Sequence, residues 1–216
     1  MSREIAVRKA STHRQASGQT PGPRFRRFVR RFLRAERGVT AIEFGLISMP
    51  LMLMTFGLLE LAMVFLVGAT LDAATINASR QIRTGEFQTS AANTGANFKA
   101  LVCSGMGWLS SQCASGLWVS VQTFSNFSGL AAAPPPNPLA FTPATRAATV
   151  AALCFSAGQP TDIVLVRTYF QWNLFTPLLD RALENMGGGS GTRLITSTTA
   201  FRNEPYNVNP PLGTSC

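Results

Sequence analysis

The residues of this sequence that could do chemistry are two glutamates inside an apolar run and four cysteines that follow it. Glu43 and Glu60 lie in residues 39–71, which are otherwise apolar apart from serine and threonine. The one histidine, His13, stands before the run, and the chain contains no Cys-x-x-Cys pair, nucleophile elbow or phosphate-binding loop. We therefore predict a protein that is not an enzyme and that needs no metal and no cofactor.

Each of the two glutamates is costly in an apolar run unless it is paired or reaches water, so both are candidate functional residues. Glu43 stands near the start of the run, where an amino group could pair with it. The alternative for Glu43 is an interfacial carboxylate solvated by lipid headgroups. Glu60 follows 17 residues later, about 100° further round a helix. We therefore predict that it contacts a different partner helix, the alternative being a glutamate that is protonated or that reaches the interface.

The run that holds both glutamates has the length and composition of a membrane span. Thirteen of residues 44–67 are Leu, Ile, Phe or Val, which together favour insertion by roughly 4 to 8 kcal/mol. Glu60 opposes insertion by at most about 3.5 kcal/mol, so insertion wins. Residues 44–71 would form a helix about 42 Å long, more than the apolar core of about 30 Å requires. Pro50 removes one backbone hydrogen bond and predicts a kink.

Positive charge is concentrated before the span. Residues 1–38 contain eleven of the 19 basic residues and two of the 10 acidic ones, so they carry the whole net charge of +9. By the positive-inside rule this basic leader lies in the cytoplasm and residues 72–216 lie across the membrane. The alternative is that the leader binds nucleic acid. The apolar run that follows favours the membrane interpretation, and we predict no nucleic-acid partner.

All four cysteines lie beyond the span, where an oxidising compartment would allow them to pair. Four cysteines allow three pairings. We favour Cys103 with Cys113, because that loop is short, which leaves Cys154 with Cys216. Zinc is the alternative, but the Cys-x-x-Cys spacing is absent and His13 is in the leader.

Beyond the membrane the sequence predicts a small α+β domain. An apolar stripe at helical spacing continues the membrane helix to about residue 84, through Leu71, Ala74, Thr75, Ala78 and Ile82. Strands are predicted at 117–124, 163–172 and 193–202, the second being central because it is apolar on both faces. Thr176 followed by Pro177 predicts the start of a helix that packs on these strands. The fold of residues 86–158 is otherwise left open.

The boundary between leader and span resembles the processing site of type IV prepilins, because Gly38 precedes the apolar run and Glu43 and Phe44 follow it. The sequence further resembles the TadE-like family, the minor pseudopilins of the tight-adherence (Tad, or Flp) type IV pilus system. That resemblance rests on residues 36–47, Pro50, residues 57–61 and the C-terminal segment 199–206. It implies that a prepilin peptidase cuts after Gly38, so that the mature chain begins at Val39.

From the resemblance we expect three parts: a cleaved cytoplasmic leader (1–38), a transmembrane helix that continues into the periplasm (39–84) and a periplasmic domain (85–216). The implied function is pilus assembly and adherence, in the bacterial inner membrane or on the pilus. The implied partners are the peptidase, other pilins or pseudopilins, Tad machinery proteins and membrane lipid. The alternative function is a signal-anchored periplasmic enzyme or sensor with an uncleaved N-terminus.

Overall fold

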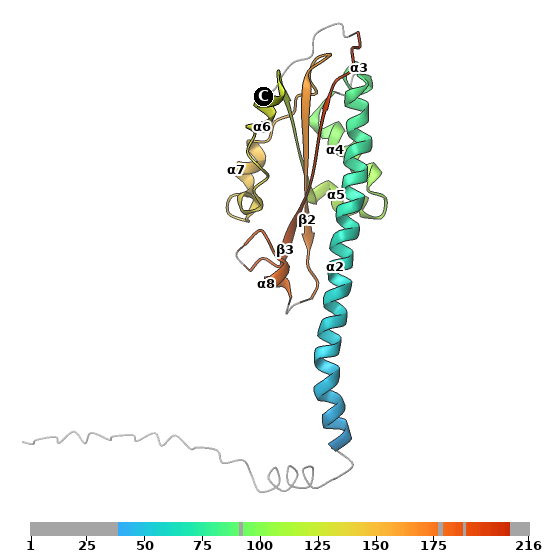
Figure 1. The fold of residues 1–216 in the computed structure, drawn as a ribbon, viewed down its shortest axis with the longest axis vertical. Helices are drawn as coiled ribbons and strands as arrows, with labels where there is room; N and C mark the ends of the chain where they lie inside the picture. The colour runs from blue at the N-terminus through green and yellow to red at the C-terminus, as the bar shows by residue number, and fades with distance from the viewer. Residues whose placement is uncertain (1–38, 91–92, 177–178, 188, 208–216) are drawn as a thin grey trace, which may run out of the picture. The chain divides into compact units, whose positions relative to one another are not determined.

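A computed structural model describes residues 39–90, 93–176, 179–187 and 189–207. The leader therefore lies outside the described residues. The contacts divide the chain into two units, Met1–Met52 and Leu53–Cys216. The first unit contributes the start of helix α2 to the described structure, and the second contains the rest of that helix and an α+β domain (Figure 1).

Helix α2 (Val39–Arg83) is a continuous helix of 45 residues that includes Pro50. Apolar side chains are exposed along its first half, while the predicted stripe from Leu71 to Ile82 is buried in the domain, with at most 2% of each side chain exposed. The stripe is therefore confirmed. Arg80 and Arg83 lie in the last turn, where positive charge complements the helix dipole. Among the described residues, α2 is the one helix long and apolar enough to cross a membrane.

The domain contains a three-stranded antiparallel sheet in the order β1-β2-β3. Its strands are β1 (Leu117–Phe124), β2 (Ile163–Asn173) and β3 (Thr192–Arg202). All three lie within a residue of the predicted positions, and β2 is central as predicted. Because β2 is buried on both faces, its apolar residues do not alternate with polar ones as they do in an edge strand. The predicted α+β fold is confirmed.

Short helices occupy the connections, namely α3 (Glu86–Thr89), α4 (Gly95–Gly105), η2 (Gly107–Leu109), α5 (Ser110–Gly116), α6 (Phe127–Ala131), η3 (Pro138–Phe141), α7 (Arg146–Ala151) and α8 (Asp180–Leu183). Within the second unit the sheet lies between α2 on one face and α6 and α7 on the other (Figure 1). The first face packs Val164, Val166 and Phe170 against α2 and α4. The second packs Tyr169 and Leu194 against η3 and the residues around α7.

A buried hydrogen bond joins α2 to the centre of the sheet. The hydroxyls of Thr75 and Thr168 are 2.8 Å apart, and both residues are fully buried. We predict that Thr75→Val lowers the free energy of unfolding by about 1–2 kcal/mol, because it leaves the Thr168 hydroxyl buried and unpaired. Thr75→Val combined with Thr168→Val should cost less than the two single changes together. Urea denaturation of the four proteins measures this coupling, and additive costs would contradict the prediction.

The helix predicted to begin at Thr176 ends earlier than the sequence suggests. Residues 177 and 178 lie outside the described residues, and α8 is a single turn that ends at Leu183. Within the described part of the chain the Thr176 hydroxyl is buried without a hydrogen-bond partner, so the predicted capping bond is not formed there. The backbone N–H of Thr176 instead has a partner on α2, as described next.

Candidate functional site: the membrane helix and its buried glutamate

The predicted processing residues lie at the start of α2. Gly38 is outside the described residues, and Val39 is the first residue of the helix. Glu43 and Phe44 follow within the first two turns, and both are exposed, with 73% of Phe44 accessible. Exposed side chains here are available to another molecule or to lipid. Their roles in processing and in partner contact stay predictions.

Glu60 lies at the middle of the same helix and is fully buried. Its carboxylate binds two successive backbone amides of the domain. Oε1 accepts a hydrogen bond from the N–H of Phe175 at 2.8 Å, and Oε2 accepts one from the N–H of Thr176, also at 2.8 Å. Each oxygen therefore has a donor. We call Glu60 with these two amides the Glu60 clamp.

The clamp holds the connection that follows β2. Leu174, just before the two amides, donates its N–H to the carbonyl oxygen of Gly191 at 2.9 Å, which ties this loop to the start of β3. Gly57, one turn before Glu60, lies so close to the loop that an added Cβ would come within 2.7 Å of Leu179 Cδ1. A glycine at 57 and a glutamate at 60 thus place the loop directly against α2.

The electrostatics of the clamp explain how a carboxylate can be buried there. Removing an unpaired carboxylate from water costs several kcal/mol, whereas hydrogen bonds from two N–H groups to the charged oxygens offset much of that cost. The partners are backbone dipoles of the same chain. This arrangement fixes a loop to a helix. Both groups that bind the carboxylate are backbone N–H donors, so neither can accept a proton or act as a nucleophile. The predicted contact of Glu60 with a partner helix stays a prediction, but both oxygens are already engaged within the chain.

An apolar groove lies beside the clamp, between α2 and α8. Its volume is about 340 Å³, and the described residues that line it are apolar. The α2 side is formed by residues that include Leu53, Gly57 and Leu61, and the α8 side by Leu179, Ala182 and Leu183. The groove is thus continuous with the exposed apolar surface of α2.

At the other end of α2, the C-terminal segment closes over the last turn. The N–H of Glu204 donates to the carbonyl oxygen of Arg83 at 2.9 Å, and the two side chains form a salt bridge of 3.3 Å. The hydroxyl of Tyr206 accepts a hydrogen bond from Gln88 Nε2 at 2.8 Å and one from Asn203 at 3.3 Å. Burial, with the nearby charge of Asp162, raises the pKa of Tyr206 above its usual value. The hydroxyl is therefore neutral at physiological pH and can also donate to a carbonyl oxygen.

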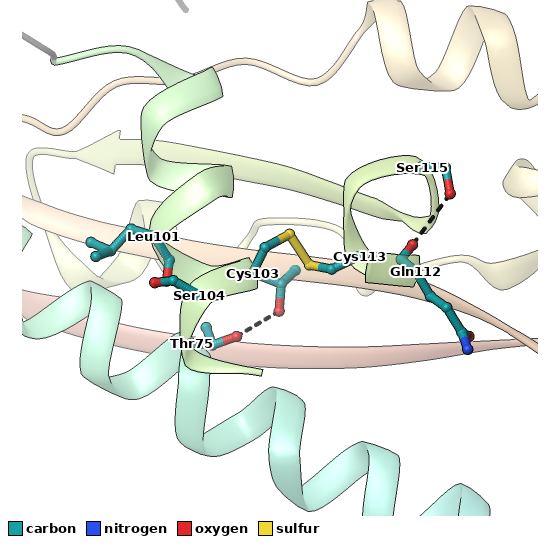
Figure 2. The surroundings of a disulfide bond; sticks show 8 residues. Thr75, Leu101, Cys103, Ser104, Gln112, Cys113 and Ser115 are labelled. Atoms are coloured by element: carbon teal, nitrogen blue, oxygen red, sulfur yellow. Dashed lines mark hydrogen bonds between the residues drawn. A yellow bond between two sulfur atoms is a disulfide. The ribbon is translucent and has the colours of Figure 1, made fainter. Parts of the chain in front are cut away.

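Cys103 of α4 and Cys113 of α5 are joined by a disulfide (Figure 2). The bond closes the turn that contains η2, next to the position at which Thr75 reaches the sheet. Cys154 is also disulfide-bonded, and its predicted partner, Cys216, lies outside the described residues. No group of three or more possible metal ligands occurs within the residues that the structure describes.

A polar recess of about 880 Å³ lies near β1 and the end of β2. Arg146 lies over the ring of Trp118, 5.7 Å from its centroid, and donates to Gln171 Oε1 at 2.9 Å. Phe141 packs near the same ring, with centroids 5.5 Å apart. Arg146 and Phe141 thus both engage Trp118, and we assign no ligand to the recess.

Sequence reasoning identified Glu60 but missed its partners. The amides of Phe175 and Thr176 are more than a hundred positions away, and backbone N–H groups leave no trace in a sequence. The cluster around Tyr206 was missed in the same way, although the segment that contains it had been singled out for its family resemblance. The signal that could have led to the contact of Glu60 was the combination of a glutamate deep in an apolar span with a glycine one turn before it.

Comparison with known proteins supports the resemblance noted from the sequence. The family model described as TadE-like protein matches residues 38–80, which include the glycine before the helix, both glutamates and most of α2. No curated protein and no solved structure gives a significant match to the chain. The TadE-like family is a component of the Tad pilus and is not known for enzymes, so the match suggests a pilus-associated protein that interacts with other Tad components. The resemblance is thus confirmed over residues 38–80, where the chain matches the model of the TadE-like family.

Proposed function

We propose that this chain is a minor pseudopilin of the Tad pilus, processed by a prepilin peptidase and required for pilus assembly and adherence. The observation that carries the proposal is the family match that begins at Gly38 and extends along the whole apolar part of α2. A match confined to the domain would have left the leader and the span unexplained. Here the matched segment contains both the cleavage glycine and the helix that the mature protein would keep.

In this proposal residues 1–38 are a temporary cytoplasmic leader, residues 39–84 are the membrane helix and its periplasmic continuation, and residues 85–216 are the periplasmic domain. The concentration of positive charge before the span supports this orientation. The disulfide between Cys103 and Cys113 supports an oxidising compartment for the domain. The protein would be held in the inner membrane or incorporated into the pilus.

Glu43 would act together with the new N-terminus. Cleavage after Gly38 would create an amino group at Val39, four residues before a carboxylate that is exposed on the helix. A cation of this kind compensates a carboxylate in an apolar layer, either within one chain or between neighbouring subunits. The proposed partners are therefore other pilins or pseudopilins, with the peptidase acting before them and lipid surrounding the helix.

The test is to replace Gly38 by leucine in cells that contain the peptidase. The side chain should obstruct entry of an extended backbone into the protease, so the accumulated protein should keep residues 1–38 and pili should be lost. Intact-mass measurement of the membrane fraction detects this. Gly68→Ala is the matched control, because an added Cβ at Gly68 would meet its nearest neighbour at an ordinary 3.7 Å. It should be processed as the unchanged chain is.

The alternative, a periplasmic enzyme or sensor with an uncleaved anchor, gives the opposite result. The unchanged chain would then retain Met1 in cells with an active peptidase, and Gly38→Leu would alter neither its mass nor piliation. Deleting residues 1–37 distinguishes our proposal from a leader that binds nucleic acid. Our proposal predicts a misoriented and unprocessed protein, whereas nucleic-acid binding predicts a correctly inserted protein that has lost that binding.

A further inference from the structure

The exposed apolar surface of α2 extends past the point at which the domain begins to pack on it. The domain reaches the helix at Gly57 and Glu60. On the rest of the circumference, large apolar side chains stay exposed in close succession as far as Leu66, namely Leu58 (58%), Leu59 (53%), Leu61 (40%), Phe65 (76%) and Leu66 (49%), after which Ile76 stands alone at 58%. Such a surface is unfavourable in water but normal in lipid.

The length of the span places these same residues in the membrane. An apolar core of about 30 Å requires about 20 helical residues at 1.5 Å each. The first large exposed apolar residue of α2 is Ile42, and 20 residues counted from it end at Leu61. A tilted helix needs more residues, which moves the end further towards Leu66. The turn that includes Gly57 and Glu60 is therefore the last part of the span.

The parts of the domain that touch this turn must lie at the same depth. They are the loop that donates to Glu60 and helix α8. The face that they turn towards α2 suits an apolar environment, because among the described residues the α8 side of the groove is lined by Leu179, Ala182 and Leu183. Arg181 of α8 is exposed and does not line the groove, and its long side chain reaches the headgroups from this depth. Phe175, one of the two residues that bind Glu60, is itself 52% exposed.

The Glu60 clamp agrees with this depth. In water a carboxylate needs no partner, whereas in the apolar layer each unpaired polar group costs several kcal/mol. Both oxygens of Glu60 are paired and none of the residue is exposed. The same bonds also satisfy two backbone N–H groups of the loop, which in an apolar layer would otherwise lack a partner.

We propose that α8 and the loop before it rest in the membrane leaflet on the domain's side, with lipid acyl chains filling the groove between α2 and α8. The groove is continuous with the lipid-facing surface of α2, which favours lipid over a separate protein. The proposal rests on the part of the proposed function that inserts α2 into the membrane. It adds that part of the domain lies in the membrane. An ordinary anchor would leave the whole domain in water.

The test uses nitroxide labels on the full-length chain in liposomes of phosphatidylethanolamine and phosphatidylglycerol. Ala182→Cys places a label at the groove, and Phe127→Cys, where Phe127 is 61% exposed on α6, gives the aqueous reference. Leu46→Cys, where Leu46 is 72% exposed, gives the membrane reference. Labelling is done without reductant because Cys103, Cys113 and Cys154 are disulfide-bonded, and the unsubstituted chain is the labelling blank. Collision rates with oxygen and with a water-soluble nickel chelate are compared.

The expected result is a ratio of oxygen to nickel collisions at Ala182→Cys that is several-fold above that at Phe127→Cys and similar to that at Leu46→Cys. A ratio at Ala182→Cys equal to the aqueous reference, while Leu46→Cys reports lipid, overturns the proposal and leaves the span intact. Protection from both agents, with dipolar broadening between labels, means that a second chain fills the groove and also overturns it. Nickel access at Leu46→Cys refutes the span itself, and the proposal with it.

Discussion

Replacing Glu60 with alanine should lower the free energy of unfolding of the domain by about 3 kcal/mol or more. The change removes both acceptors of the Glu60 clamp and leaves the N–H groups of Phe175 and Thr176 without them. Each buried, unsatisfied donor costs about 1–3 kcal/mol. For a chain of this size, a loss of 3 kcal/mol lowers Tm by about 6–12 °C. Thermal unfolding in detergent, followed by near-ultraviolet circular dichroism, measures the change.

Glu60→Gln separates hydrogen bonding from the space that the side chain fills. Glutamine has nearly the same shape but one acceptor oxygen, so one of the two amides loses its partner and about half of the loss should remain. Glu86→Gln is the control, because Glu86 is exposed; its effect should lie within about 0.5 kcal/mol. If Glu60→Ala unfolds at the temperature of the unchanged chain, the loop is held by something other than the clamp.

Gly85→Ala should be the second severe substitution, with a loss of about 3 kcal/mol or more from two causes. Gly85 has φ of +79°, a region that L-residues with a side chain rarely adopt. An added Cβ would also overlap Cγ of Tyr206 and lie 2.6 Å from two further ring carbons. Since the Tyr206 hydroxyl is held by Gln88 and Asn203, the ring cannot move without breaking those bonds. Urea denaturation measures the loss.

Gly107→Ala is the matched control for backbone strain alone. Gly107 also has positive φ (+56°), but an added Cβ there would meet nothing within 4 Å. Gly107→Ala should therefore lower the free energy of unfolding by about 1 kcal/mol. Gly85→Ala combined with Tyr206→Ala should cost less than the two single changes together, because the overlap disappears. Equal losses for Gly85→Ala and Gly107→Ala would show that the contact with Tyr206 does not matter.

The parts of the fold that the sequence predicted are those whose pattern repeats over many residues. The buried stripe from Leu71 to Ile82 and the three strands follow from periodicity, because one face of each element meets the core. Short helices such as α6 and α7 have too few turns for a pattern, and α7 shows no buried residue to mark it. The helix expected after Thr176 ends at Leu183, since Asn185 binds the backbone of Leu194 in β3 with both its side-chain oxygen and its side-chain nitrogen.

The candidate site could be predicted only in part, for a related reason. A costly carboxylate is visible in a sequence, since its neighbours are apolar, and both glutamates were found in that way. The hydrogen-bond donors to Glu60 depend on the tertiary fold, which brings the loop after β2 to α2. The disulfide between Cys103 and Cys113 is partly predictable from the sequence, because its short loop limits the possible partners.

Helix α2 is attached to the domain at two separated levels, by Glu60 at one and by Arg83 with Glu204 at the other. Arg83 follows Glu60 by 23 positions, a rise of about 35 Å along the helix. A force that pulls the helix along its axis would therefore load both attachments and the packed stripe between them in shear, so that many bonds must break at once. A helix fastened at one level would instead peel away bond by bond at a much smaller force.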